Sequence, residues 1–227
     1  MLQKKDFIEI EFTGRVKDGE VFDSNLKEDL KKLHAGHDHD VETEPFIYCL
    51  GQDMFLRAVD DFLIGKPETS ATYEIELPPE KAFGRRDAKM IQKIPVKIFR
   101  DQKINPVPGY AFNFDGRIGR VLASSGGRVI VDFNNPIAGK DVIYKIKVVK
   151  KITDLHEKAK ALVHFLFRDN LKFEIKEKKI IFEVEKPLVE FIKLFKDKFQ
   201  EMLDLELEVK ESDKKDRKED KPAKKEQ

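Results

Sequence analysis

The sequence predicts an α+β protein built from three successive units. Apolar and polar residues alternate over 8–12, 73–77 and 142–148. This predicts half-buried strands of one sheet, because successive strand side chains point to opposite faces. From about Arg85, short apolar runs alternate with turn residues, a pattern typical of compact hairpins. After residue 153, apolar residues recur first at helical spacing. The return to the first pattern at 142–148 indicates that the hairpin unit is an insertion.

Composition excludes several classes of protein. Charged residues make up 38% of the 227 residues, but the signs are interspersed and the net charge is +1, which argues against nucleic-acid or membrane-surface binding. The single cysteine, Cys49, excludes an internal disulfide, and its apolar neighbours favour a buried, inert thiol. No apolar run reaches the roughly 20 residues of a membrane span, and the N-terminus lacks a signal-peptide pattern. We therefore expect a cytoplasmic protein, and the high Lys and Glu content favours a thermophilic source.

The stretch 45–65 predicts a short apolar strand, a turn at Gly51 and then a helix. The first turn of this helix is expected to carry Phe55 and Leu56, while helical spacing places Asp60 on its polar side. A helix that lies across a sheet buries one face and leaves such apolar groups to line a cleft. The pattern predicts this geometry and no particular chemistry.

Two shorter segments contain candidate site residues. Val21–Ser24 follows a hairpin signal and places Asp23 directly after an aromatic residue. By itself, such an aspartate more often holds a turn through main-chain N–H groups. A loop after a predicted strand end contains Phe83 followed by Gly84.

A polar, charged segment over 25–44 contains His34, His37 and His39. Imidazoles with neighbouring carboxylates can hold a divalent transition metal such as nickel or zinc. The irregular spacing and the lack of cysteine differ from structural metal sites. A solvated loop that binds no metal, or that captures metal only adventitiously, therefore remains an open alternative.

The insertion over 86–136 reads as a small all-β unit, of a size at which a hydrophobic core is marginal. It has more apolar residues than so small a core requires. Either some of them are exposed and bind other chains, or they pack against the neighbouring unit. Both interpretations are kept open.

The segment 153–210 predicts a helix, two strands, a second helix that begins near Pro187, and a closing strand. The second helix has a stripe rich in phenylalanine. We expect this unit to bury that stripe against a copy of itself and to form a homodimer. The residues 211–227 are of mixed charge and predict a disordered tail.

Several motifs together resemble the FKBP family of peptidyl-prolyl cis–trans isomerases. In chain order they are Ile10–Gly14, Val21–Ser24, Pro45–Gly51 with the following helix, and Ala82–Gly84. The insertion after the last motif looks like the insert-in-flap chaperone domain of SlyD and of archaeal FKBPs. The C-terminal unit is similar to the extra domain of long-type archaeal members.

The resemblance implies a division of the chain. An isomerase domain, with an antiparallel half-barrel sheet wrapped on a short helix, would comprise 1–85 and 137–152. The inserted β chaperone domain would comprise 86–136, and a C-terminal α/β domain would follow at 153–210. The charged tail at 211–227 lies beyond it.

The resemblance also implies a site. Rotation about an X–Pro bond is opposed by a barrier of about 18–20 kcal/mol from amide resonance. No covalent bond is made or broken, so no cofactor is required, and a dry apolar pocket that favours the twisted amide suffices. The catalytic positions of the family fall on Phe12, Asp23, Leu56, Phe83 and Tyr144. Its proline-binding positions fall on Phe22, Phe46, Phe55 and Val59.

In the family, the carboxylate that matches Asp23 acts through its electric field, and the backbone N–H at the position of Leu56 binds a substrate carbonyl. Phe83 stands where many members have tyrosine, and Val59 where many have tryptophan. We expect isomerase activity to survive these differences, with weak binding of macrolide inhibitors. The tail has no histidine or cysteine, which argues against nickel delivery.

The resulting hypothesis is an isomerase that acts on unfolded or proline-containing polypeptides. Its insertion would hold those chains through exposed residues, namely Ile94, Ile98, Phe99, Tyr110 and Phe112. One alternative is a holdase chaperone with an idle isomerase pocket. Another is a metal-handling protein that uses the histidine-rich segment.

Overall fold

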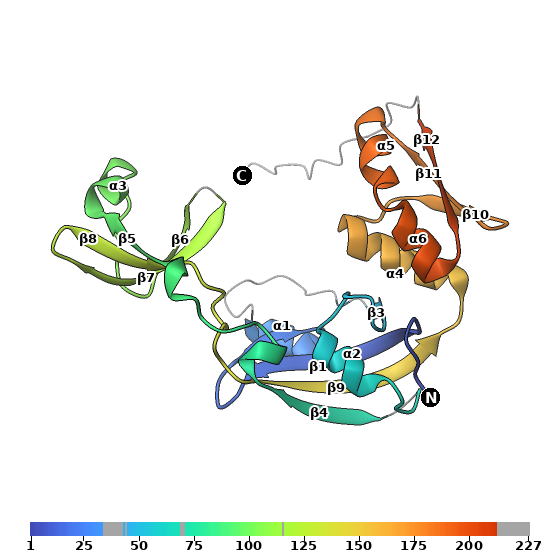
Figure 1. The fold of residues 1–227 in the computed structure, drawn as a ribbon, viewed down its shortest axis with the longest axis horizontal. Coiled ribbons are helices and arrows are strands. Elements are labelled where there is room, and N and C mark those ends of the chain that lie inside the picture. Colours follow the sequence, from blue (N-terminus) through green and yellow to red (C-terminus); the bar gives the residue numbers. More distant parts are fainter. Residues whose placement is uncertain (34–42, 44, 69–70, 115, 213–227) are drawn as a thin grey trace, which may run out of the picture.

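The computed structural model describes residues 1–33, 43, 45–68, 71–114 and 116–212. These residues form three β-sheets, of five, four and three strands, together with short helices (Figure 1). The α+β fold class is therefore confirmed. Of the tail predicted over 211–227, Glu211 belongs to a strand instead, and residues 213–227 lie outside the described residues.

The five-stranded sheet is antiparallel throughout. Its strands are β1 (Phe7–Val16), β2 (Val21–Ser24), β3 (Phe46–Cys49), β4 (Thr72–Leu77) and β9 (Val142–Ile152). The order is β2-β1-β9-β4, and β3 pairs with the other part of β1. β1 is longer than predicted, because it continues past the expected end at Gly14 to pair with both β2 and β9.

Two helices of this unit differ from the prediction. The central helix, α2 (Arg57–Leu63), begins after Leu56, so Phe55 and Leu56 precede it and do not form its first turn. A further helix, α1 (Lys27–Leu33), lies in the segment expected to be irregular. α1 buries no residue, and it therefore lacks the apolar stripe that identifies a helix in a sequence.

The insertion contains a four-stranded antiparallel sheet with the order β5-β8-β7-β6. Its elements are η2 (Ala88–Met90), β5 (Ile91–Pro95), α3 (Val96–Asp101), β6 (Ala111–Phe114), β7 (Arg117–Ser125) and β8 (Arg128–Asp132). The expected all-β unit thus includes a short helix, α3. Phe99 of this helix and three valines of the sheet form a small core, separate from that of the five-stranded sheet.

The C-terminal unit combines three helices with a three-stranded sheet. Its elements are α4 (Leu155–Phe167), β10 (Phe173–Lys176), β11 (Lys179–Val184), α5 (Lys186–Lys193), α6 (Lys196–Leu203) and β12 (Glu206–Glu211). The second helix predicted from Pro187 onward is two helices, α5 and α6. They form the crossover between the parallel strands β11 and β12.

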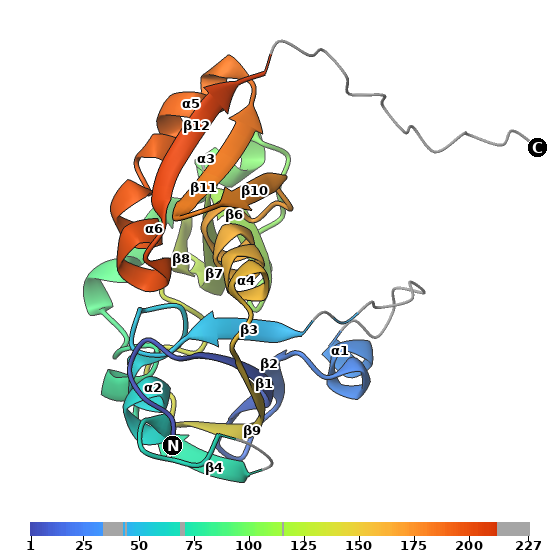
Figure 2. The same ribbon diagram turned by 90° about the vertical axis from the view of Figure 1, so that its right-hand side faces the viewer.

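The C-terminal unit shares its core with the five-stranded sheet. Ala159 and Leu162 of α4 belong to the same buried cluster as Tyr48 and Cys49 of β3, and Figure 2 shows α4 beside that strand. Burial raises the pKa of the Cys49 thiol to about 12, so this thiol stays protonated and inert. No helix of the described ranges is long and apolar enough to cross a membrane.

Candidate functional site

Six aromatic residues from distant parts of the chain lie together on the five-stranded sheet. They come from β1, β2, β3 and β9, from the turn before α2 and from the loop after η1 (Pro79–Lys81). This aromatic cluster consists of Phe12, Phe22, Phe46, Phe55, Phe83 and Tyr144. All six are residues predicted for the site.

Ring contacts connect the whole aromatic cluster. The Phe83 and Phe22 centroids lie 5.4 Å apart, and the Phe22 and Tyr144 centroids 5.9 Å apart. Tyr144 is 5.5 Å from Phe55, which is 5.1 Å from Phe12. These four contacts are edge-to-face, an arrangement that aromatic quadrupoles favour. Phe12 and Tyr144 are almost fully buried and form the floor of the cluster. Phe22, Phe55 and Phe83 are half-buried, so they present an apolar surface above that floor.

Gly14 allows this packing, and the sequence did not identify its role. In the strand register Gly14 stands between Asp23 of β2 and Tyr144 of β9. Partners across a sheet point to the same face, so the two functional side chains flank a position that has none. A Cβ atom on Gly14 would lie 2.9 Å from Tyr144 Cε1 and 3.2 Å from Phe22 Cζ. The absence of a side chain at Gly14 therefore lets these rings approach the sheet.

Asp23 is a half-buried carboxyl group at the edge of the aromatic cluster. Burial raises its pKa, and a hydrogen bond with the main chain of Ser24 partly offsets this effect. The pKa of Tyr144 is also raised, mainly by burial and further by the negative charge of Asp23. Because its pKa is raised, Tyr144 stays a neutral phenol at physiological pH.

Polar residues hold β2 against β1 next to this site. The Asn25 carboxamide accepts a hydrogen bond from the Phe12 N–H at 2.7 Å and donates one to the Ile10 carbonyl at 2.8 Å. The Ser24 hydroxyl donates to the Phe12 carbonyl at 2.9 Å. These bonds extend the pairing of β1 beyond the last residue of β2, and so they help to place Asp23.

Leu56 occupies the N-cap position of α2 with an extended backbone. Its carbonyl accepts hydrogen bonds from the N–H groups of Val59 and Asp60, at 2.9 and 3.1 Å. Its own N–H donates no hydrogen bond within the described part of the chain. An unpaired N–H in a half-buried position is available to a ligand carbonyl.

Val59 has no exposed surface and belongs to the core. It supports the site from within the core and does not form the contact surface that was predicted. Its side chain points inward because Val59 lies on the same buried face of α2 as Leu63, and that face packs into the core.

The prediction that Asp60 lies on the polar side of the helix is wrong. Asp60 is 1% exposed, and its Oδ2 atom accepts a hydrogen bond from the Gly51 N–H at 2.9 Å. Burial raises its pKa to about 6, against the lowering effect of the Gly51 hydrogen bond and of the nearby Tyr48 hydroxyl, which makes no hydrogen bond of good geometry in the described residues. The Tyr48 ring contacts both Phe46 and Phe55 at 5.5 Å. Asp60 therefore connects the turn at Gly51 to α2, beneath the aromatic cluster.

The residues predicted to bind clients on the insertion are not all exposed. Tyr110 is 61% exposed and Ile98 is exposed, while Ile94 and Phe112 are half-buried. The prediction that Phe99 is exposed is wrong, because it forms the centre of the small core and packs edge-to-face on Phe112. Three exposed apolar residues were not predicted, namely Val107, Ile118 and Leu122.

The candidate metal ligands His34, His37 and His39 lie outside the described residues. Within the described ranges, no group of three histidine, cysteine, aspartate or glutamate side chains is placed to hold a metal ion. A cavity of about 730 Å³ lies beside β10, away from the aromatic cluster, and its lining includes His156, Lys160 and Phe173.

Comparison with known proteins assigns the family. Residues 1–100 match the sequence model described as FKBP-type peptidyl-prolyl cis-trans isomerase. Residues 1–100 belong to this family. Residues 92–137 match a second model, described as the IF domain of FKBP26. The resemblance seen in the motifs is confirmed, and the protein is an enzyme of the peptidyl-prolyl isomerase type.

Named relatives cover different shares of the chain. The short-type peptidyl-prolyl cis-trans isomerase of Methanocaldococcus jannaschii is 28% identical over 148 residues, which cover 65% of this chain and 92% of that protein. The SlyD isomerases of Aeromonas hydrophila and Haemophilus influenzae are 24% and 29% identical, and the alignments cover 62% and 53% of this chain. The chain spans 60% and 65% of those two proteins. A structure of the three FKBP domains of wheat FKBP73 matches 68% of this chain and 42% of that chain, with 17% identity and a TM-score of 0.34.

Proposed function

We propose that this protein is a folding catalyst that isomerises X–Pro bonds in unfolded polypeptides. The isomerisation takes place on the aromatic cluster, and the insertion holds the client chain. The observation that carries the proposal is the row of Asp23, Gly14 and Tyr144 across three strands, surrounded by half-buried rings. This arrangement combines an apolar surface with one oriented charge.

The chemistry follows from the barrier to amide rotation. Resonance makes the planar amide polar, and the twisted transition state loses that resonance. An apolar surface formed by Phe22, Phe46 and Phe55 binds the prolyl ring and favours the less polar twisted amide. The free N–H of Leu56 holds the carbonyl of a neighbouring peptide bond, so that the chain is fixed on one side of the rotating bond.

Asp23 acts through its negative charge and does not donate a proton. Its carboxylate lies near the Tyr144 phenol, whose pKa it raises. A preorganised charge that interacts differently with the planar and twisted amides lowers the barrier without bond chemistry. Phe83 contributes an aromatic edge but no hydroxyl, so this site has one hydrogen-bond donor fewer than a tyrosine would supply.

The insertion supplies a separate binding surface. Its core is distinct from that of the isomerase unit, and Ile98, Tyr110, Ile118 and Leu122 are all exposed. A client held there raises the local concentration of its prolines near the aromatic cluster. The cytoplasm, where nascent chains are abundant, is the proposed location.

The C-terminal unit is proposed to form a homodimer. Phe191, a residue of the predicted phenylalanine-rich stripe, is 46% exposed, and Leu194, which was not part of that stripe, is 78% exposed. These two residues at the junction of α5 and α6 offer an apolar contact to a second copy. Sedimentation of the full chain and of Leu194→Glu tests this contact, and equal masses would contradict it.

The decisive experiment is proline-limited refolding of a test protein with catalytic amounts of the full chain. We expect acceleration, and we expect Asp23→Ala to reduce it strongly, while Asp61→Ala, which changes an exposed carboxylate on α2, leaves it unchanged. If both variants still accelerate refolding as the wild type does, the site is wrongly assigned. If the wild type suppresses aggregation without accelerating refolding, the protein is a holdase and the isomerase proposal fails.

A further inference from the structure

Two chain segments connect the insertion to the five-stranded sheet. One leaves the aromatic cluster at Phe83 and Gly84 and runs to residue 90, and the other returns over 132–139. We call these two segments the neck. At its lower end, the Gly139 N–H donates to the Gly84 carbonyl at 2.8 Å. At its upper end, the Phe133 N–H donates to the Met90 carbonyl at 3.0 Å.

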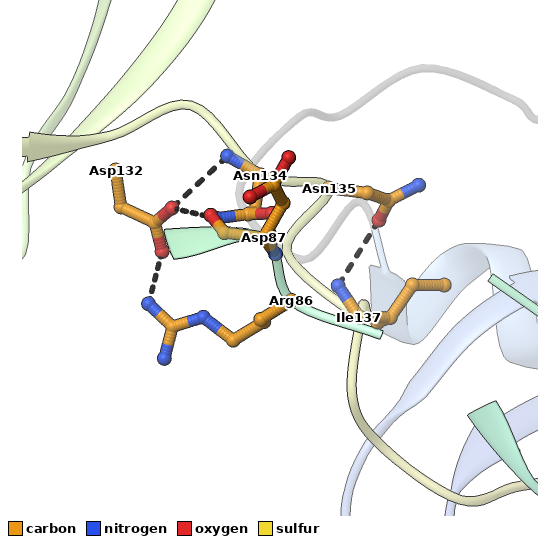
Figure 3. Close-up of polar contacts among 6 residues, drawn as sticks. All are labelled: Arg86, Asp87, Asp132, Asn134, Asn135 and Ile137. Atoms are coloured by element: carbon orange, nitrogen blue, oxygen red, sulfur yellow. Dashed lines mark hydrogen bonds and ion pairs between the residues drawn. The ribbon is translucent and has the colours of Figure 1, made fainter. Parts of the chain in front are cut away.

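Between these two bonds, one side chain replaces the missing main-chain pairing. The carboxamide of Asn134 accepts a hydrogen bond from the Asp87 N–H at 2.8 Å and donates one to the Asp87 carbonyl at 3.0 Å (Figure 3). Both main-chain groups of Asp87 are thus bonded to a single side chain of the returning segment. A carboxamide carries a donor and an acceptor in fixed geometry, and it suits this bridge for that reason.

Asp132 holds this carboxamide in place. Its Oδ1 atom accepts hydrogen bonds from the Asn134 side chain at 2.7 Å and from the Asn134 main chain at 3.0 Å. Its Oδ2 atom accepts a hydrogen bond from Arg86 of the outgoing segment (Figure 3). Burial alone would raise the pKa of Asp132, but the Asn134 and Arg86 hydrogen bonds outweigh this effect and keep the pKa below its ordinary value. The carboxylate therefore stays charged, and both segments of the neck are tied to it.

We propose that Asn134 is a positioning residue for the reaction on protein clients. By bridging the neck, it fixes the orientation of the insertion, so that a chain held there reaches the aromatic cluster next to Phe83. The inference rests on the proposed function of the insertion and deepens it. Without the bridge, main-chain pairing is confined to the two ends of the neck and, of the polar contacts in the described residues, only the Arg86–Asp132 ion pair still crosses it, so the insertion is free to swing relative to the sheet.

The neighbouring Asn135 provides a matched control. Its side chain accepts a hydrogen bond from the Ile137 N–H at 3.0 Å, within its own segment, and it does not reach across the neck (Figure 3). Asn134→Ala and Asn135→Ala therefore remove the same chemistry from adjacent positions, with and without the crossing bonds. Asn134→Asp is a second test variant, because it loses the donor to the Asp87 carbonyl and places a second negative charge beside Asp132.

The first measurement concerns geometry alone. Spin labels at Ser125→Cys, at the tip of the insertion, and at Thr72→Cys, on β4, report the distance between insertion and sheet; both positions are exposed. Cys49 is fully buried and stays unlabelled. We expect Asn134→Ala and Asn134→Asp to broaden the distance distribution, and Asn135→Ala to leave it unchanged. Equal widths in all four proteins would overturn the proposal, whatever the protein does to its clients.

The second measurement separates short from long substrates. For a proline-containing tetrapeptide, we expect kcat/KM of the Asn134 variants to equal that of the wild type, since the aromatic cluster is untouched. For a proline-limited unfolded protein, kcat/KM should fall by about threefold to tenfold, because tethering gains depend on geometry. Binding of a permanently unfolded protein to the insertion should be unchanged.

Three results would overturn the proposal: equal losses on both substrates, a loss as large in Asn135→Ala, or no loss on the unfolded protein. A wild type that fails to accelerate refolding would instead refute the proposed function. In that case the distance measurement still decides whether Asn134 locks the neck.

Discussion

The aromatic cluster and the insertion use the same kinds of side chain in opposite ways. In the cluster, six rings contact one another above a core that extends into the C-terminal unit. Among the described residues of the insertion, the buried centre consists of Phe99 and three valines, and large apolar residues of β7 face outward, for example Ile118 at 67% exposed. A unit of this size without a covering layer cannot bury both faces of its sheet. The difference shows that an apolar residue with enough surrounding elements is buried in a core, whereas one without them stays exposed and is available to bind another chain.

The strongest test of this contrast is removal of residues 86–136 with a short glycine linker. Activity on a proline-containing tetrapeptide should persist, because the aromatic cluster belongs to the remaining sheet. Activity on an unfolded protein should fall by about a hundredfold, as expected when a tether is lost. Comparison of kcat/KM on both substrates checks this, and parallel losses would show that the two regions are not functionally distinct.

A second test targets the close approach that distinguishes the aromatic cluster. In Gly14→Ala, the new Cβ atom would lie 2.9 Å from Tyr144, so the ring must shift. We expect a loss of about 1–3 kcal/mol of unfolding free energy, as for other overpacked cores, and a fall in kcat/KM on tetrapeptides. Gly126→Ala also adds strain, because Gly126 has a φ of +59°, but its Cβ meets open space at a turn of the insertion, so it serves in the tetrapeptide assay as a control for strain away from the aromatic cluster. Unchanged kcat/KM in Gly14→Ala would contradict the role given to the Asp23–Tyr144 pair.

A third test concerns the buried carboxyl group beneath the aromatic cluster. The native state raises the pKa of Asp60 from its ordinary 3.8 to about 6, and therefore binds a proton more tightly than the unfolded state. Stability due to this group is present below pH 4 and is lost as the pH rises to about 6. We expect Asp60→Asn to abolish this decline and to be more stable than the wild type above pH 6, by an amount on the order of 2–3 kcal/mol.

Urea unfolding between pH 4 and pH 8 measures this effect. Asp61→Asn removes the adjacent exposed carboxylate, whose charge adds a small part of the rise in the pKa of Asp60; it should keep the decline and move it only slightly to lower pH. If the unfolding free energies of Asp60→Asn and of the wild type change in parallel between pH 4 and pH 8, ionisation of Asp60 does not destabilise the native state.

The smallest effect is expected for single changes on the insertion surface. Tyr110→Ser removes one exposed ring and should weaken binding of an unfolded protein by about twofold to fivefold, since many weak contacts share the energy. Folding stability should hardly change, because Tyr110 contributes little to the small core. Leu26→Ser, an exposed apolar residue before α1, is the matched control. Weakening of the same size in both variants would mean that exposed apolar surface in general binds clients, not the insertion.

Much of the architecture could be read from local patterns. The strand alternation around Phe12, Ile75 and Ile146 predicted a half-buried sheet, and these strands pair in the structure. The helix α1 escaped prediction because it is held by polar contacts, such as the hydrogen bond from Thr13 to Asp29 at 2.6 Å, and not by an apolar stripe. Patterns of apolar spacing report burial, and a helix that buries nothing leaves no such pattern.

The site divides in the same way. Motif order placed the six aromatic residues, and the structure brings them together. The error at Asp60 arose because helical spacing defines two faces but not which face meets a core, and the error at Phe99 arose because the helix α3 that buries it was not predicted. The role of Gly14 was invisible for a related reason, since it depends on the register that aligns Asp23 and Tyr144 on either side of it.

By itself, the sequence determined the alternation of strands and helices, the point of insertion near residue 85 and the residue types available for an apolar site. These features depend on neighbours along the chain. Only the tertiary structure decided that Gly14 separates two functional side chains, that Asp60 is buried and that Asn134 bridges the neck. Each of these depends on groups brought together from distant positions, and such contacts are set by packing and register, which local sequence patterns do not contain.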